Sequence, residues 1–380
     1  MGSAEKVSWK RVLILAGAII AFTIGSGFAT GQEIIQYYTA YGVKGLLVIL
    51  VFLVAFLYYN FNFAKAGAEQ KFEKGNDVYK HFCGKYVGTF CDYYSTLFCY
   101  MSFFVMVGGA SSTLHQEYGL PAWVGGVILT ALAVLTVVGG LNSMVDAIGA
   151  VGPVIVVLCI AIGVITLIRD GGDIGAGLDI IKNAAYEGAA NGETIKSAGS
   201  NWLVSGLSYA GFVLLWFASF TAALGSNKKK ELNYGIIGGT VAVCVAIAVV
   251  MFAQISNINT PMIGSSDTFV WNADIPNLIL AAKIWKPFSA IFAIIVFAGI
   301  YTTAVPLLYN PASRFAKEGT SQFKILTIVL GVLGLIVGLF LPFRVLVNII
   351  YVLNGYVGAV LILFMIYKNI KDLMNKKKAN

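Results

Sequence analysis

Long apolar runs, separated by short polar stretches, divide the chain into ten segments. Runs of this length predict membrane-spanning helices, because about 20 helical residues cross the hydrocarbon layer, whereas a transmembrane strand needs about ten residues of alternating pattern. The expected spans are 9–39, 42–66, 86–112, 121–140, 142–169, 200–225, 231–256, 286–312, 322–342 and 343–369. The pattern therefore predicts an all-α, polytopic membrane protein with no β-barrel.

Composition supports this prediction and excludes a soluble protein. The chain is 58% hydrophobic and 12% charged, against about 25% charged in an ordinary globular protein. The net charge of +8 would suggest nucleic-acid binding in a soluble chain, but here the basic residues flank apolar spans. We therefore expect a lipid bilayer, and no nucleic acid, as a partner. The five cysteines form no CxxC pair and are interpreted as packing residues.

The distribution of Lys and Arg predicts the orientation in the membrane. With the N-terminus inside, 19 of the 26 basic residues fall on the inner side. The seven on the outer side are Lys44, Arg169, Lys182, Lys196, Lys283, Lys286 and Arg344. Cytoplasmic loops carry such an excess, so we expect both termini in the cytoplasm and the chain in a bacterial inner membrane. The apolar run after Arg11 continues through Tyr38, so we interpret it as the first span and not as a signal peptide.

Two spans contain small-residue runs near their centres. Span one reads Ile24-Gly25-Ser26-Gly27-Phe28, and span six reads Ser205-Gly206-Leu207-Ser208-Tyr209-Ala210-Gly211-Phe212. Either run alone is equally well explained by a close helix–helix contact. However, the two spans lie five apart, so two halves of five spans would enter the membrane in opposite directions. Interrupted helices at matching positions of inverted halves indicate a transporter binding site.

This arrangement predicts one transmembrane domain over residues 1–380. It consists of an inverted repeat of about 9–169 and 200–369, with helices 1 and 6 broken near Ser26 and Ser208. Unwound backbone at that depth must line a cavity or be buried in protein. Its free amides and carbonyls would then bind a substrate.

The run Thr23-Ile24-Gly25-Ser26-Gly27-Phe28 resembles the unwound first helix of LeuT-fold transporters in the amino acid–polyamine–organocation superfamily. Phe217-Ala218-Ser219-Phe220 resembles the segment after the sixth-helix break in the sodium-coupled amino acid branch, and the wider string GSGFATGQEIIQYY resembles the YkvI-type membrane proteins of bacteria. The resemblance implies the LeuT fold over essentially the whole chain, and a transport function.

The resemblance also implies a sodium site between spans one and eight. Carbonyls of Ala21 and Ile24 would face Gly299, Thr302 and Thr303, which share one helical face at i, i+3 and i+4. Neutral oxygen ligands suit a monovalent cation. The alternative is that the threonine hydroxyls bond carbonyls of their own helix. Proton-coupled relatives carry a lysine in span five, and its absence from 144–168 favours sodium.

The substrate is expected between the two breaks. Amides around Ser26 and Gly27 would meet a carboxylate, and carbonyls near Thr23 and Ser208 would meet an ammonium group. By the same resemblance, aromatic residues of spans three and six would close over the substrate. The candidates are Tyr100, Phe104, Tyr209 and Phe212, although most aromatic residues of this chain simply pack.

Glu33 is an acidic residue well inside the first span, and such a residue is a functional candidate. On a straight helix it lies about 9 Å outward from the glycines, which predicts a role at the outer gate.

These observations together favour a secondary active transporter, sodium-coupled, for a neutral amino acid or similar small zwitterion. The alternative is a proton-coupled or uncoupled transporter of another small organic solute, such as a nucleobase or betaine; a channel is less favoured. An enzyme is not expected, because His81 and His115 lie in boundary loops and the sequence contains no P-loop. No cofactor is expected besides the coupling ion, and the sequence does not predict the oligomeric state.

Overall fold

The computed structural model describes residues 7–72, 74–139, 151–190, 192–225 and 229–379. The described residues are mostly helical, with one isolated β-bridge between Pro261 and Phe269. The elements of the first half are α1 (Trp9–Thr23), α2 (Ser26–Thr30), α3 (Gln32–Tyr37), η1 (Thr39–Lys44), α4 (Gly45–Gln70), α5 (Asp77–Tyr118), α6 (Ala122–Gly139) and α8 (Val151–Asp170). After η2 (Gly171–Asp173) and α9 (Ile174–Asn183) follow α10 (Trp202–Gly225), α11 (Lys229–Ile255), α12 (Pro276–Ile284), α13 (Lys286–Phe315), α14 (Ser321–Phe340), α15 (Phe343–Leu346), η3 (Val347–Tyr351) and α16 (Val352–Ala379).

The ten predicted spans are present. Within the described residues, nine helices are long and apolar enough to cross a membrane, and α1 to α3 together form the remaining crossing, which is interrupted. Residues 142–150 of the fifth predicted span lie outside the described part. The described part of that span begins with α8 at Val151. Helix α5 starts nine residues before its predicted span because a short helical turn precedes Gly84, whose φ of 74° interrupts the helix.

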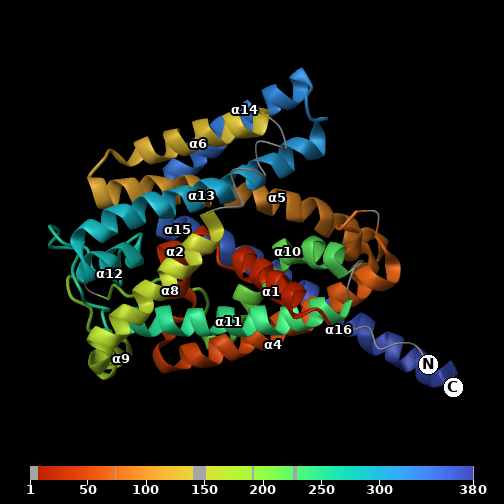
Figure 1. Cartoon of the computed structure of the whole chain (residues 1–380), viewed down its shortest axis with the longest axis horizontal. Coiled ribbons are helices and arrows are strands. Elements are labelled where there is room, and N and C mark those ends of the chain that lie inside the picture. The colour runs from red at the N-terminus through yellow and green to blue at the C-terminus, as the bar shows by residue number, and fades with distance from the viewer. Residues whose placement is uncertain (1–6, 73, 140–150, 191, 226–228, 380) are drawn as a thin grey trace.

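The helices form two groups (Figure 1). Helices α5, α6, α13 and α14 pack on one another on one side, while α1, α4, α10 and α11 pack on the other. In an inverted repeat, a contact between two helices should recur between their counterparts in the other half. The contact of α1 with α11 recurs as that of α10 with α4, and the contact of α5 with α14 recurs as that of α13 with α6. The architecture is therefore consistent with two inverted halves of five spans.

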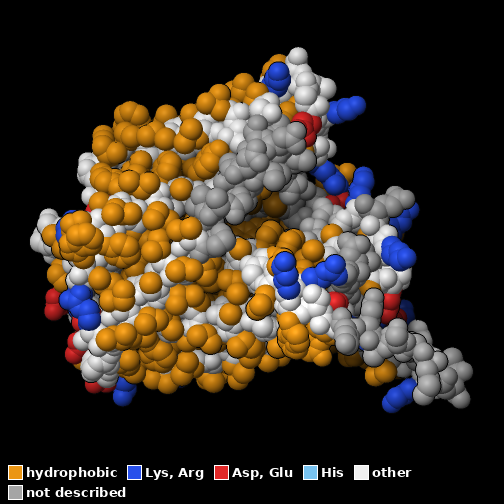
Figure 2. Space-filling view, viewed as in Figure 1, with side chains coloured by type: hydrophobic (Ala, Val, Ile, Leu, Met, Phe, Trp, Pro, Cys, Tyr) orange, Lys and Arg blue, Asp and Glu red, His pale blue; other side chains and the backbone are white. Residues whose placement is uncertain are grey.

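The surface has the polarity of a membrane protein. Figure 2 shows hydrophobic side chains across most of the visible face, with Lys, Arg, Asp and Glu gathered at its two ends. Exposed Leu13, Leu135, Val157 and Leu333 contribute to this apolar surface. Because lipid tails solvate such side chains, the chain is a multi-pass membrane protein.

The sixth span does not break, which corrects the prediction from its glycine and serine residues. Helix α10 is continuous from Trp202 to Gly225. A Cβ at Gly211 would overlap the backbone of Gly355 in α16, and one at Gly206 would press on Val51 of α4. Gly225 likewise lies against the backbone of Ala64 in α4. The glycines of this span therefore allow two neighbouring helices to approach closely, which is the packing alternative.

Candidate functional site

The first span breaks where the sequence predicts. Helix α1 ends at Thr23, Ile24 has ψ of 78°, and Gly25 is extended before α2 begins at Ser26. The amide of Ile24 still donates to Ile20 O at 2.7 Å, but the chain then leaves the helical path. The carbonyls of Ala21, Phe22 and Thr23 therefore have no amide of a following helical turn to accept from.

A second break, at Gly31, was not predicted. Gly31 has φ of 84°, a left-handed conformation that favours glycine. Side-chain amides from the second half of the chain bind the carbonyls freed there. Gln254 Nε2 donates to Gly31 O at 2.9 Å, and Asn277 Nδ2 donates to Ala29 O at 3.0 Å and Phe28 O at 3.4 Å. These distant amides give no signal in the local sequence.

The position predicted for Glu33 was wrong. The predicted distance of about 9 Å from the glycines requires a straight helix, but the first span is interrupted at Gly25 and again at Gly31. The Glu33 carboxyl lies directly against Gly27, at the place that a Cβ would occupy. Its Oε2 accepts a hydrogen bond from the Tyr209 hydroxyl at 3.1 Å, and the residue is only 4% exposed. Glu33 is thus part of the break itself, and a role in gating stays a prediction.

Two of the predicted aromatic residues, Tyr209 and Phe212, lie close to this segment. The Tyr209 ring packs edge-on against Tyr37, Tyr38 and Phe212, with ring centroids 4.9–5.1 Å apart. Phe212 in turn stacks on Tyr351 at 4.8 Å. Tyr351 ends η3, a π-helical turn, and such turns are frequent at functional sites. Tyr351 was not among the residues predicted from the sequence.

The two candidates in span three, Tyr100 and Phe104, face α14 and not the break in the first span. The Tyr100 hydroxyl donates to Leu330 O in α14 at 2.8 Å, and Phe104 packs on Tyr100 with centroids 4.7 Å apart and lies beside Gly334 of α14. An aromatic residue of α5 that does contact α10 is Phe98, which stacks on Trp216 with ring centroids 5.4 Å apart. Tyr100 and Phe104 are spaced from Phe98 by two and six residues, which places them on other faces of the helix.

The predicted polar residues are not all brought together. Ser208 donates to Val352 O of α16 at 3.3 Å, and Thr23 donates to Ile19 O of its own helix at 2.8 Å. The backbone of Ser26 begins α2, whereas its side chain lies outside the described part. Of this set, Gly25, Gly27 and the backbone at Thr23 and Ser26 form the break, while Ser208 contributes to helix packing.

The threonines proposed for sodium make ordinary helical bonds in this structure. Both Thr302 Oγ1 and Thr303 Oγ1 donate to Gly299 O at 2.9 Å. A Cβ at Gly299 would overlap the Ile155 side chain of α8. Ala21 lies in the last turn of α1 and buried Ile24 at its C-cap. A sodium site at these residues stays a prediction.

Polar contacts join the segment before α12 to α3, α5 and α15. Asp274 accepts from Ser112 at 2.6 Å, Gln32 donates to Ala273 O at 2.9 Å, and Arg344 donates to Asn272 O at 3.0 Å. Next to them, Gln36 donates to Arg344 O at 2.8 Å. A cavity of about 100 Å³ remains beside these residues. The segment before α12 thus connects α3 and α5 to α15.

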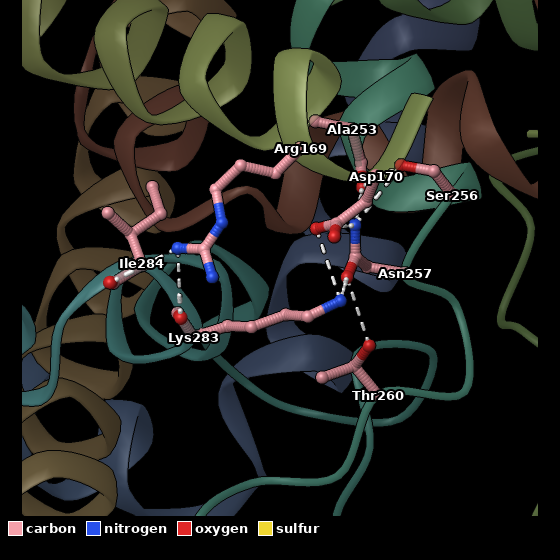
Figure 3. Close-up of polar contacts among 8 residues, drawn as sticks. All are labelled: Arg169, Asp170, Ala253, Ser256, Asn257, Thr260, Lys283 and Ile284. Atoms are coloured by element: carbon pink, nitrogen blue, oxygen red, sulfur yellow. Dashed lines mark hydrogen bonds and ion pairs between the residues drawn. The ribbon is translucent and has the colours of Figure 1, made fainter. Parts of the chain in front are cut away.

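A second group of polar contacts fixes α12 to the end of α8 (Figure 3). Lys283 forms an ion pair with Asp170 at 3.1 Å and donates to Asn257 Oδ1 at 2.5 Å. Arg169 donates to Ile284 O at 3.2 Å. Helix α12 also buries Leu278 to Ala281 against the rest of the molecule, so both polar and apolar contacts hold it in place.

Comparisons with known proteins agree with this architecture. No protein-family model matches the chain. It is 20% identical to the uncharacterized membrane protein YkvI of Bacillus subtilis (strain 168) over 299 residues, 78% of each chain. It is 27% identical to the uncharacterized protein YyaD of the same strain over 132 residues, a match that spans only 35% of this chain and 36% of YyaD.

Solved structures resemble the chain over most of its length. The crystal structure of MhsT in complex with L-phenylalanine superposes with a TM-score of 0.63 and 14% identity, covering 95% of this chain and 89% of MhsT. The inward-facing conformation of Mhp1 gives a TM-score of 0.56 and 16% identity, covering 93% of this chain and 75% of Mhp1. The interrupted first span, the helix pairs related by inversion and these two superpositions establish together that the chain has the LeuT fold.

Proposed function

We propose that this chain is a secondary active transporter that moves a small zwitterion, a neutral amino acid, together with sodium by alternating access. The observation that carries the proposal is the break between α1 and α2, where carbonyls of the last turn of α1 lose their helical amide partners inside a membrane protein. Unsatisfied backbone groups in the bilayer core cost several kcal/mol each. A bound ligand would satisfy these carbonyls.

The chemistry around the break supports a substrate with an apolar side chain. Tyr209 and Phe212 present aromatic rings near α3, and among the described residues no Lys or Arg side chain contacts Gly27 or Glu33. A second carboxylate, as in aspartate, would therefore be buried without a counter-charge, which is unfavourable. The solved structure of MhsT contains L-phenylalanine, which supports an amino acid as the class of substrate.

A sodium ion is proposed between the carbonyls of Ala21 and Ile24 and the hydroxyls of Thr302 and Thr303. The two hydroxyls already lie on one face of α13 around Gly299 O. A rotation of each side chain would exchange this helical bond for the ion. Thr302→Ala and Thr303→Ala should each weaken sodium binding by about 1–3 kcal/mol, while Thr327→Ala, whose hydroxyl donates to Phe323 O within α14, serves as the control.

A thermal-shift screen of the purified protein tests the proposal. Leucine, isoleucine, valine and phenylalanine should raise the unfolding temperature in sodium and much less in potassium, and the two threonine variants should need more sodium for the same shift. Competition by aspartate, glutamate or lysine that exceeds that of the neutral amino acids would contradict the substrate class. Uptake that ignores sodium and follows a proton gradient would contradict the coupling ion.

A further inference from the structure

Glu33 is a buried acid, and among the described side chains one, Tyr209, donates a hydrogen bond to it. Tyr209 of α10 donates to Oε2 at 3.1 Å, while Oε1 lies on the bare backbone of Gly27. A carboxylate can accept about four hydrogen bonds. The ionised group is thus stabilised here by one neutral hydroxyl, far fewer donors than water would supply.

Among the described residues, the groups that face Glu33 carry no positive charge. Within electrostatic range are the hydroxyls of Tyr209 from α10, Tyr37 and Tyr38 from the end of α3, and Tyr351 from η3. Helix α11 contributes the neutral amide of Gln254 at Gly31 and the thiol of Cys244 beside Tyr38, and η1 contributes Tyr41 beside Tyr37. Glu33 takes part in none of the five ion pairs found among the described residues.

An ionised Glu33 would need a cation to balance its charge. The close packing around the carboxyl group limits the size of that cation. Rings of Phe52, Tyr37, Tyr38 and Phe212 surround the Tyr209 ring at centroid distances of 4.9–5.1 Å. Glu33 lines neither the cavity between α4, α5 and the C-terminal part of α16 nor the small cavity beside Gln36 and Arg344. A proton neutralises a carboxylate without needing volume, whereas a substrate ammonium group or a coordinated metal ion needs both volume and further ligands.

We propose that Glu33 is a proton-binding site linked to the break in the first span. In the conformation described, Oε1 forms an O–H bond with a proton taken from water in the access path, and the charge of the group changes from −1 to zero. When α2 and α3 move away from α10 during the transport cycle, the carboxyl loses its position on Gly27 and returns the proton to water. The release step rests on the proposed transport function, whereas the protonation of Glu33 does not.

Gly27 connects the proton to the break. Because it lacks a Cβ, the carboxyl of Glu33 can lie on the backbone of α2. The carbonyl of Gly27 also accepts from Thr30 Oγ1 at 2.7 Å, which holds this short helix in shape. Any rearrangement of α2 on binding a substrate therefore changes the surroundings of the Glu33 carboxyl directly.

Infrared difference spectroscopy tests the protonation without a substrate. Spectra of the purified protein are compared between about pH 5 and about pH 9. We expect one carboxylic acid band from a water-excluded site that titrates in the wild type and is absent from Glu33→Gln. The matched control Glu187→Gln removes an exposed acid and should retain the band. An identical band in Glu33→Gln, or no titrating band in the wild type, would contradict the proposal.

Two further variants separate a proton site from a merely structural role. Tyr209→Phe removes the donor to Oε2 and should change the pH at which the band is half developed, whereas Phe56→Leu, in the same aromatic cluster, should leave it unchanged. Unfolding temperatures confirm that each variant is folded. An unchanged titration in Tyr209→Phe would also contradict the assignment to Glu33.

The outcomes of this test and of the thermal-shift screen are distinct. A band assigned to Glu33 in a protein that responds to neither amino acids nor sodium would keep the proton site and overturn the proposed substrate. A sodium-dependent amino acid response in a protein without the Glu33 band would keep the proposed function and overturn the proton site.

Discussion

The first and sixth spans contain similar runs of glycine and serine, yet only the first is broken. Helix α10 passes through Ser205–Phe212 without interruption, whereas the first span is divided at Gly25 and again at Gly31. The difference lies in what surrounds each glycine. Gly206 and Gly211 face the helices α4 and α16 at backbone distance, whereas nothing lies within 4 Å of the Cβ position at Gly25.

The comparison shows what a break in a membrane helix requires. Carbonyls freed at Gly31 receive amides from Gln254 and Asn277 of the other half of the chain, and such partners make unwound backbone tolerable in a bilayer. The glycines of α10 instead lie against the closely packed helices α4 and α16. A glycine run therefore permits a break, but polar partners from other segments determine whether one forms.

The largest loss of stability is expected from a substitution that disrupts the packing of the sixth span. Gly211→Val would place a branched side chain against the backbone of Gly355 and Ala359, and overpacking against backbone should destabilise the protein by about 3 kcal/mol. Thermal unfolding of the purified protein measures this effect. Gly25→Ala, at a position with open space, is the matched control, and equal unfolding temperatures for the two variants would contradict the packing role of α10.

A smaller effect is expected at the second break of the first span. Gly31→Ala places a Cβ at a φ of 84° and against the side chains of Asn277 and Gln254. The left-handed conformation alone costs about 1–2 kcal/mol for an alanine. The variant should therefore unfold at a lower temperature than Gly25→Ala, and its response to amino acids and sodium should also weaken. A variant as stable as the control would show that the chain does not adopt the turn at Gly31.

The smallest effect is expected outside the spans, at the contacts of α12. Lys283 and Asp170 have side chains that are 36% and 17% exposed, and such pairs contribute about 0–1 kcal/mol. Lys283→Met should lower stability within that range at low salt, and less at high salt because ions screen the pair. A loss as large as that of Gly31→Ala would contradict the small contribution expected of this partly exposed ion pair.

The sequence predicted the parts of the fold that depend on local pattern. Span lengths and the break after Thr23 follow from apolar runs and from the Gly-Ser-Gly run, because both are properties of neighbouring residues. The orientation of side chains was less predictable. Tyr100 and Phe104 turn to α14, and Phe98 takes the place expected of them, because the rotation of α5 is set by packing against distant helices.

The inward position of Glu33 could not be predicted for a related reason. The estimate of its height required a continuous helix beyond Gly27, and the second break depends on Gln254 and Asn277, more than 200 residues away. The same glycine pattern in span six produced an incorrect prediction, because close packing and unwinding select the same small residues.

Backbone hydrogen exchange tests the difference between the two spans most directly. In the protein without substrate, the amides of Gly25 to Phe28 should exchange quickly, because the first residues of α2 lack helical acceptors, while those of 206–212 in the buried helix α10 should exchange slowly. Sodium with leucine and phenylalanine should slow exchange at the first-span break and leave α10 unchanged. Slow exchange at both segments, or a substrate-dependent change in 206–212 without one at the first-span break, would contradict a binding site formed by the first span.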